Sequence, residues 1–128
     1  MADDARIGVL AAPNFSAGAV IFTEIARAAA TLVAPLGFGA YIHEAHHAQK
    51  KDAPSGTARG LERALRRGGW APAIDLSSTR AGSIPGTHTV RDRGTFARGA
   101  LVAARWLKGR RGWFTMHDCL GLHTGEQP

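Results

Sequence analysis

The sequence predicts an α+β fold in which a small mixed sheet packs against helices. Apolar residues recur at helical spacing in three segments, short apolar runs lie between these segments, and glycine or proline residues separate them. The 128 residues are 45% hydrophobic and 20% charged, a composition typical of a globular protein. We therefore expect residues 1–128 to form a single domain.

The N-terminal part of the chain predicts a turn followed by a helix. Residues 7–11 form a short apolar run, expected to be a strand or an extended entry, and residues 12–16 (Ala-Pro-Asn-Phe-Ser) indicate a turn. A helix over residues 17–32 follows, with Ser16 as its N-cap. Its apolar residues at helical spacing are Val20, Ile21, Ile25, Ala28, Ala29 and Leu32.

The middle of the chain predicts a strand, a polar loop and a second helix. Pro35 and Gly37 end the first helix, and residues 38–43 are expected to form a strand. The polar loop begins at Glu44 and reaches Pro54. A helix over residues 56–67 then places Ala58, Leu61, Ala64 and Leu65 on one face and stops at Gly68 and Gly69.

The C-terminal half predicts two further strands and a third helix. Residues 74–79 and 88–90 are the strand candidates, and the helix covers residues 95–108. Phe96, Leu101, Ala104 and Leu107 of this helix are available to a core. Residues 113–122 are apolar and are expected to form a short strand or a docking segment, and the tail 123–128 is expected to fray.

The charge of the chain is uneven. The formal net charge is +6, and the whole excess lies in residues 61–128, mostly as arginine. Such a bias can attract phosphates or nucleic acid, but no nucleic-acid motif with interleaved aromatic residues accompanies it. We interpret the arginines as solvated helix faces and keep weak, basic nucleic-acid binding as an alternative function.

Two classes of protein are not expected. No apolar run approaches the roughly 18–20 residues that cross a bilayer, so we expect no membrane span, and the first residues lack the basic start of a secretory signal. The only cysteine, Cys119, has no internal disulfide partner. A reducing, cytoplasmic location is the default expectation.

The residues most informative about chemistry lie between Glu44 and Ala58. Ionisable groups cluster where the predicted strand ends: they are Glu44, His46, His47, Lys50 and Asp52. Histidine can donate or accept a proton near neutral pH. The helix that begins after Pro54-Ser55 offers free backbone N–H groups to an anion. The loop therefore suits a small carboxylate substrate that undergoes protonation.

A metal site is a weaker interpretation of the same segment. His43, His46 and His47 form a His-x-x-His-His pattern, but no third or fourth ligand at a suitable spacing accompanies it. We therefore expect no metal. A solvated turn at Lys50 to Asp52 and a simple helix cap at Ser55 to Thr57 are the other structural interpretations.

Residues 44–58 resemble the signature E-x-H-H-x-x-K-x-D-A-P-S-G-T-A of the 4-hydroxy-tetrahydrodipicolinate reductase (dihydrodipicolinate reductase) family at every fixed position. Further segments resemble the family over most of the chain. They are Ala-Pro-Asn-Phe-Ser (12–16), Arg-Ala-Gly (80–82), Gly-Thr-His-Thr-Val (86–90), Phe-Ala-Arg-Gly-Ala (96–100) and Met-His-Asp-Cys-Leu-Gly-Leu (116–122). In the segment 86–90, Thr87 replaces an acidic residue of the family pattern.

The resemblance implies an oxidoreductase of lysine and diaminopimelate biosynthesis that uses NADPH or NADH. His46 would donate or accept a proton and Lys50 would donate one. The substrate carboxylates would be held by His47, Gly56 and Thr57, and the nicotinamide end of the cofactor would be contacted by Ala12, Pro13, Asn14 and Phe15.

The chain departs from the family pattern in three places. The sequence contains no G-x-G-x-x-G after an N-terminal strand, so the resemblance is to the C-terminal domain without the dinucleotide-binding (Rossmann) domain. The connection 69–74 is short. A family strand after Val90 is missing, which is expected to shrink the sheet that builds the family's tetramer and to expose an edge.

These departures leave several functions open. The chain is a reductase, or the substrate-binding part of one that works with a separate dinucleotide-binding chain. Alternatively it is a non-catalytic remnant that binds a dicarboxylate or only forms a homo-oligomer. We expect no specific nucleic-acid partner and no membrane.

Overall fold

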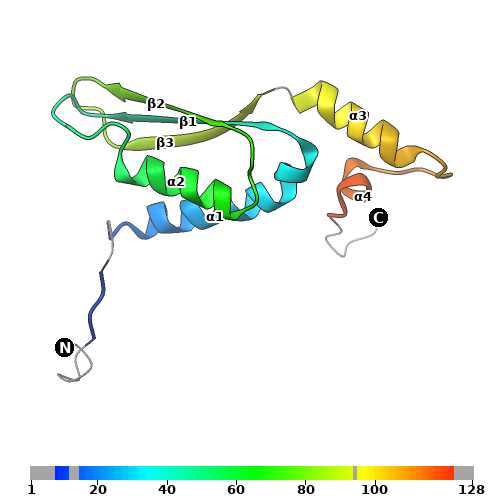
Figure 1. Ribbon diagram of the computed structural model, residues 1–128, viewed down its shortest axis with the longest axis horizontal. Helices are drawn as coiled ribbons and strands as arrows, with labels where there is room; N and C mark the ends of the chain where they lie inside the picture. Colours follow the sequence, from blue (N-terminus) through cyan, green and yellow to red (C-terminus); the bar gives the residue numbers. More distant parts are fainter. Residues whose placement is uncertain (1–7, 12–14, 94, 123–128) are drawn as a thin grey trace.

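The chain forms helices and three strands in a computed structural model, which describes residues 8–11, 15–93 and 95–122, without the side chains of residues 92–98. The order is α1 (Ala17–Val33), the 3-10 helix η1 (Ala34–Leu36), β1 (Gly39–His46), α2 (Gly56–Arg67), β2 (Ile74–Arg80), β3 (Thr87–Arg93), α3 (Thr95–Leu107) and α4 (Met116–Leu120) (Figure 1). The predicted α+β fold with a small mixed sheet is confirmed.

The sheet has β1 at its centre. Its strand order is β2-β1-β3, with β1 parallel to β2 and antiparallel to β3. Parallel neighbours need a crossover, and α2 provides it between β1 and β2. In this register Glu44 lies opposite Ser78 of β2 and His88 of β3. Residues from all three strands therefore meet beside Glu44.

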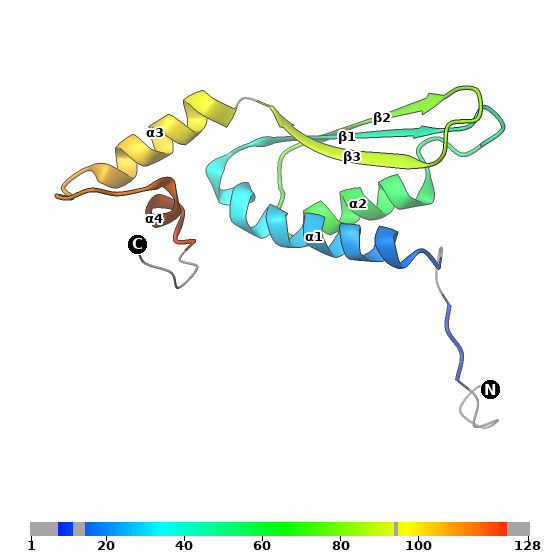
Figure 2. The same cartoon turned by 180° about the vertical axis from the view of Figure 1, so that it is seen from behind.

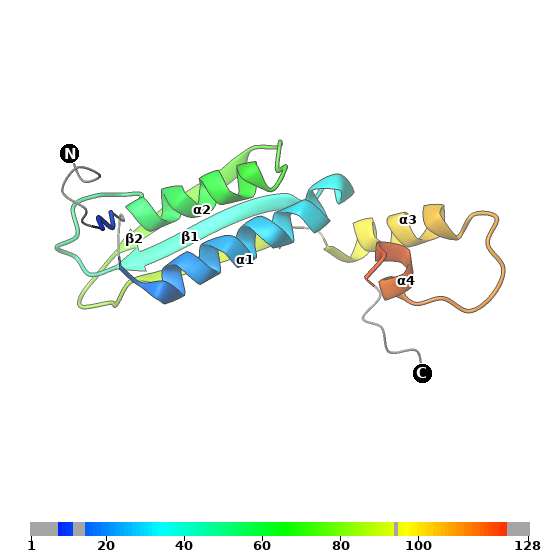
Figure 3. The ribbon, with the colours of Figure 1, turned by 90° about the horizontal axis from the view of Figure 1, so that it is seen from below.

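Helices cover one face of the sheet. α1 and α2 run side by side against it, and the views from the front, from behind and from below agree on this arrangement (Figures 1, 2 and 3). Along β1 the buried residues alternate with less buried ones, so that Ala40, Ile42 and Glu44 face the helices. Tyr41 and His43 lie on the other face, where both contact the hydroxyl of Ser77.

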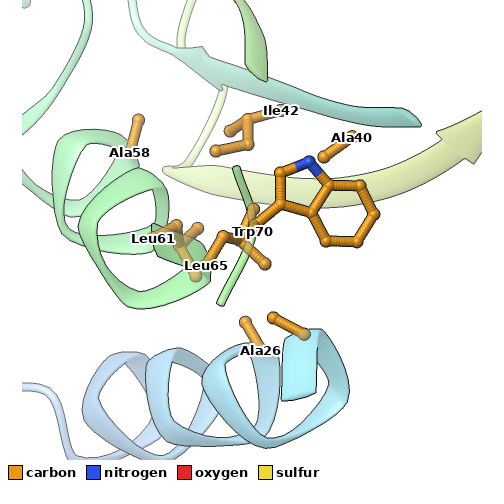
Figure 4. Packing of buried hydrophobic residues seen from close by; sticks show 8 residues of the cluster. Ala26, Ala40, Ile42, Ala58, Leu61, Leu65 and Trp70 are labelled. Carbon is orange, nitrogen blue, oxygen red and sulfur yellow. The ribbon is translucent and has the colours of Figure 1, made fainter. Parts of the chain in front are cut away.

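The core is small and rich in alanine. It joins α1, β1 and α2, and Trp70 closes it at the end of α2 (Figure 4). The two helices approach closely at Gly68, where a Cβ atom would lie 2.5 Å from the carbonyl oxygen of Arg27 and 2.6 Å from the Cβ of Ala30. The buried residues are Ala26, Ala30, Ala40, Ile42, Ala58, Leu61, Ala64, Leu65 and Trp70.

Helix α2 confirms its prediction from the sequence. It spans the expected residues, its buried face is the expected one, and it ends at Gly68. The Ser55 hydroxyl caps its first turn by accepting a hydrogen bond of 3.2 Å from the N–H of Ala58. Helix α1 likewise begins after Ser16, whose hydroxyl accepts from the N–H of Ala19.

Several predicted boundaries need correction. β1 runs three residues beyond the predicted end, so Glu44 and His46 belong to the strand and not to the loop. Residues 8–11 have no regular structure. The segment 113–122 is not a strand, because it contains α4 after a Thr115 cap. The predicted fraying of residues 123–128 lies outside the described residues.

The C-terminal helices α3 and α4 extend beyond the end of the sheet (Figures 1 and 2). Leu101 and Leu107, expected in a core, are exposed. Aromatic contacts connect the end of α3 with the segment that follows it. The rings of Trp106 and Phe114 are 5.1 Å apart, and the guanidinium group of Arg110 lies 4.0 Å from the centre of the Trp106 ring. These contacts, between described residues, hold the end of α3 against the segment that follows it.

Helix α1 corrects the expectation that no apolar stretch of the chain is long enough to cross a membrane. Residues Ala17–Leu36 form a 20-residue helical stretch long and apolar enough to cross a membrane, by length and composition alone. That is weak evidence for a span, because core helices of soluble proteins pass the same test. Here α1 packs on α2 through Ala26 and Ala30, while Val20, Ile21 and Ile25 are between 55% and 60% exposed.

Candidate functional site

The candidate site is centred on the carboxylate of Glu44, which is fully buried at the end of β1. Its Oε1 accepts three hydrogen bonds: 3.1 Å from the Ser55 N–H, 2.7 Å from the Ser78 hydroxyl and 2.7 Å from Nη2 of Arg80. Arg80 also donates to the carbonyl of Asp52. One oxygen of Glu44 thereby ties β1 to β2 and to the start of α2.

These contacts keep Glu44 ionised. Burial alone would raise its pKa, but the hydrogen bonds from Ser55, Ser78 and Arg80 outweigh burial and lower the pKa to about 2. A carboxylate that accepts several hydrogen bonds is stabilised in its charged form. The site therefore contains a fixed negative charge at neutral pH.

His46 lies beside the second oxygen of this carboxylate. Its Nδ1 is 3.2 Å from Glu44 Oε2, and its side chain is only 12% exposed. Burial lowers the pKa of His46; the Glu44 charge opposes this, and the charges of Arg80 and Lys50 lower the pKa further. The Nε2 edge of the ring faces Gly86, where a Cβ atom would come within 2.9 Å of it.

His88 brings a second imidazole to the same place. Its ring centroid is 5.1 Å from that of His46, in an edge-to-face arrangement. Its Nε2 lies 3.0 Å from the Ser55 hydroxyl and 3.6 Å from Glu44 Oε2. Burial lowers the pKa of His88, the neighbouring His46 lowers it further, and the Glu44 charge opposes both. Two histidines thus share one carboxylate oxygen.

The loop after β1 carries the other predicted polar residues. Nζ of Lys50 is 2.6 Å from Oδ1 of Asp52. The hydrogen bond from Lys50 lowers the pKa of Asp52, and a backbone hydrogen bond from Gly56 contributes in the same direction. The Asp52 carboxylate therefore lies between the lysine and the first turn of α2. His47 is exposed, with Nδ1 3.2 Å from Gln49 Oε1.

The start of α2 has the geometry expected of an anion site. Gly56 and Thr57 are its first two residues, and Ser55 caps it. A Cβ atom at Gly56 would meet nothing within 4 Å, so the position beside this first residue is open. Backbone N–H groups at such a position attract negative charge, and the Asp52 carboxylate already uses this property.

The structure brings together part of the predicted set. His46, Lys50, Gly56 and Thr57 lie around one end of the sheet, where the β1 end, its loop and the first turn of α2 meet. The cofactor turn is mostly undescribed: Ala12, Pro13 and Asn14 lie outside the described residues, and Phe15 is 79% exposed just before α1.

Sequence reasoning gave no role to Ser78, Arg80 or His88, although the last two lie in recognised motifs. A signal was present: Ser78 and Arg80 alternate along a strand, a spacing that places both on one face. The register that sets them beside Glu44 comes from pairing between segments more than 30 residues apart.

One group of side chains has the composition of a metal site. Within the described part of the chain, Glu44, His46 and His88 each offer one ligand atom, and these atoms lie within 4.8 Å of one another. The His43, His46 and His47 set, which the sequence offered only as a weaker interpretation, does not assemble, since His43 lies on the opposite face of the sheet and contacts Ser77.

Comparisons with known proteins agree with this architecture. The model of the family described as "Dihydrodipicolinate reductase, C-terminus" matches residues 18–120. A 4-hydroxy-tetrahydrodipicolinate reductase of Stenotrophomonas maltophilia (strain K279a) is 43% identical over 132 residues, which cover 91% of this chain and 54% of that protein. The enzyme of the same name from Aquifex aeolicus (strain VF5) is 38% identical over 145 residues, with 89% and 55% covered.

A solved structure shows the same fold. It is described as "Dipicolinate bound Dihydrodipicolinate reductase from Paenisporosarcina sp. TG-14", and it matches with a TM-score of 0.54 at 23% identity, covering 94% of this chain and 48% of that one. The chain thus spans about half the length of the curated relatives it matches.

Proposed function

Because the chain belongs to the dihydrodipicolinate reductase family, whose C-terminal part it matches over residues 18–120, we propose that it binds the substrate in an NAD(P)H-dependent reduction of 4-hydroxy-tetrahydrodipicolinate to tetrahydrodipicolinate. This reaction belongs to lysine and diaminopimelate biosynthesis, and a cytoplasmic location fits it. The proposal treats residues 1–128 as one shortened C-terminal domain.

The observation that carries the proposal is the meeting of a histidine and a helix N-terminus around Glu44. The carboxylate binds the Ser55 N–H at the start of α2 and lies 3.2 Å from His46. A proton-transferring group and an anion-attracting turn are therefore fixed to the same buried residue. A reaction on a carboxylated substrate that takes up a proton needs both.

We assign the polar residues of the site as follows. His46 transfers a proton to or from the substrate, and burial lowers the pKa of its ring. Lys50 donates a proton and provides positive charge. The substrate carboxylates bind at His47, Gly56 and Thr57, in front of the first turn of α2.

Asp52 supports this assignment by its own position. Its carboxylate pairs with Lys50 and accepts a backbone hydrogen bond from Gly56, as a carboxylate of the substrate would. A bound substrate therefore competes with Asp52 or shares these donors with it. Half-exposed at the loop, the Asp52 side chain has room to turn away.

The cofactor in this proposal is NADPH or NADH, which supplies the hydride when bound. In this chain Ala12, Pro13, Asn14 and Phe15 contact its nicotinamide end, and the exposed ring of Phe15 suits such a contact. The 128 residues contain no Gly-rich dinucleotide fingerprint. The pyrophosphate and adenosine therefore require a dinucleotide-binding part that lies outside these 128 residues.

Calorimetry with pyridine-2,6-dicarboxylate tests the substrate site. We expect measurable binding by the purified chain, poor or undetectable binding of NADPH, and a loss of roughly 1–3 kcal/mol of dicarboxylate affinity in Lys50→Ala, the scale of a lost charge-assisted contact. Lys51→Ala is the matched control, because this exposed neighbour leaves the Lys50–Asp52 pair intact.

The outcomes separate the alternatives. A well-folded chain that binds no dicarboxylate would be a non-catalytic remnant of the family. Equal losses in Lys50→Ala and Lys51→Ala would reduce the site to general positive charge. Tight NADPH binding would require a cofactor site outside the residues assigned here.

A further inference from the structure

The side chains of Glu44, His46 and His88 lie at distances from one another that resemble those between the ligands of a metal ion. Oε2 of Glu44 is 3.2 Å from Nδ1 of His46 and 3.6 Å from Nε2 of His88. Zinc binds histidine nitrogen at about 2.0–2.1 Å and carboxylate oxygen at about 2.0–2.2 Å, so two ligands of a tetrahedral zinc are about 3.3–3.5 Å apart. These two separations lie on either side of this range, and the nitrogen atoms of the two histidines lie within 4.8 Å of each other.

Two of the three atoms face each other without making a regular hydrogen bond. Among the described residues, Glu44 Oε2 and His46 Nδ1 are buried, lie 3.2 Å apart and have no hydrogen-bond partner. Buried polar atoms in native proteins are almost always satisfied, and exceptions often mark an ion or a water. Glu44 is fully buried, so bulk solvent does not satisfy its second oxygen.

The surroundings of Glu44 fix which oxygen is available. Ser55, Ser78 and Arg80 all bind Oε1, and this directs Oε2 towards the two histidines. Outer contacts of this kind orient the ligands of metal sites. The Ser55 hydroxyl, 3.0 Å from His88 Nε2, would give up that contact to a metal while keeping its bond to the N–H of Ala58.

We propose that Glu44 Oε2, His46 Nδ1 and His88 Nε2 bind a divalent transition-metal ion of the zinc type, with a fourth position open to water. Two imidazoles and one carboxylate suit zinc and cobalt better than magnesium or calcium. The guanidinium of Arg80 lies on the opposite carboxylate oxygen and offsets part of the charge, so we expect moderate affinity.

This site does not depend on the proposed reductase function, although it shares His46 with it. A metal bound at Nδ1 would hold the imidazole in place, and metal binding would then compete with the proton-transfer role. The ligand set also differs from the one suggested by sequence, because His88 comes from β3 and His43 and His47 are not part of it.

Metal titration of the untagged full chain tests the proposal. We expect one Zn²⁺ per chain by calorimetry, and a visible absorption spectrum of low-symmetry, four- or five-coordinate Co²⁺ that Zn²⁺ displaces. His88→Gln and His46→Gln should each weaken Zn²⁺ binding by at least about tenfold. His43→Gln and His47→Gln are the matched controls, each removing one histidine outside the cluster, and should change the affinity less than about threefold.

Two results would overturn the metal site. One is a folded chain, verified by circular dichroism, that binds neither Zn²⁺ nor Co²⁺. The other is equal affinity in the cluster variants and the controls, which would place the metal on other side chains such as His117 or Cys119. Using both His88→Gln and His46→Gln keeps the test decisive if one variant fails to fold. Dicarboxylate binding, measured separately, reports on the reductase proposal.

Discussion

His46 is held between opposing influences on its charge. Burial and nearby cations favour the neutral ring, while Glu44 favours the protonated one. Burial is the largest of these influences and lowers the pKa of the ring, and a histidine in such a position can take part in proton transfer. Its ring is also fixed in space, because the backbone of Gly86 passes directly against it.

Replacing His46 should therefore cost turnover. In a reductase assay in which the chain is active, alone or with a dinucleotide-binding chain, we expect His46→Ala to lower turnover by about 10²–10⁴-fold, the usual range for general acid catalysis. His43→Ala, on the same strand but the opposite face, is the control. A change below about threefold in His46→Ala would remove His46 from the reaction.

The pH dependence of stability should report on Glu44. Its pKa in the folded chain is about 2, below the ordinary value of 4.5, so the unfolded chain takes up this proton first. The stabilisation is complete above about pH 5 and is lost as the pH falls towards 2. The shift of about 2.5 pKa units corresponds to on the order of 3 kcal/mol, since each pKa unit corresponds to about 1.4 kcal/mol.

Chemical denaturation from pH 5.5 to 2.5, with a chelator present, measures this loss. In Glu44→Gln we expect a lower free energy of unfolding at pH 5.5, because Arg80 loses its charged partner, and a flatter decline below pH 5. An unchanged acid slope in Glu44→Gln would mean that other carboxylates carry the acid sensitivity.

The closest helix packing should depend on one glycine. A Cβ atom at Gly68 would meet the α1 backbone at Arg27, and main-chain atoms cannot move aside cheaply. We expect Gly68→Ala to lower the free energy of unfolding by about 1–3 kcal/mol, as overpacking does. Thermal and denaturant unfolding of the purified variant measure the change.

Gly60 provides the opposite case on the same helix. The nearest atom to a Cβ at Gly60 is 4.0 Å away, so Gly60→Ala only removes the flexibility of glycine. We expect it to raise the free energy of unfolding by roughly 0.5–1 kcal/mol. If both variants changed stability in the same direction, the close α1–α2 contact would not be the cause.

The predictability of each segment depends on how local its causes are. α2 was predicted with its bounds and buried face because Ser55, its apolar spacing and Gly68 all lie within the segment. The sequence alone predicts a loop at the end of β1, because Glu44 and His46 are polar and only pairing with distant β2 and β3 buries them. Apolar spacing likewise could not reveal that Ile21 and Leu101 remain exposed.

The candidate site likewise combines features with local causes, which the sequence predicts, and features with long-range causes, which it does not. The segment 44–58 predicted a proton-transferring and anion-binding loop, and the structure places His46 and Lys50 at one end of the sheet with the start of α2. The buried contacts of Ser78, Arg80 and His88 with Glu44 come from strand register. Register is a long-range property that a single sequence does not reveal.

The net charge of +6 affects the behaviour of the chain as a unit. No part of the described structure offers a helix or sheet arranged as a known nucleic-acid reader, so attraction to DNA or RNA should be electrostatic alone. We expect such binding to be weak, independent of sequence and lost by about 200 mM salt. Sequence-selective binding that survives this salt concentration, in a fluorescence anisotropy titration, would contradict the expectation.

The buried carboxylate of Glu44 also has a consequence for how faithfully the chain folds. Sliding β1 by one residue against its neighbours would turn every β1 side chain to the opposite face. Glu44 would then leave Arg80 and the start of α2 without their anion, and His43 would enter the alanine-rich interior in its place. Misaligned sheets are thus penalised by the same charge that organises the histidines. A correctly assembled site is therefore itself evidence that the strands have aligned.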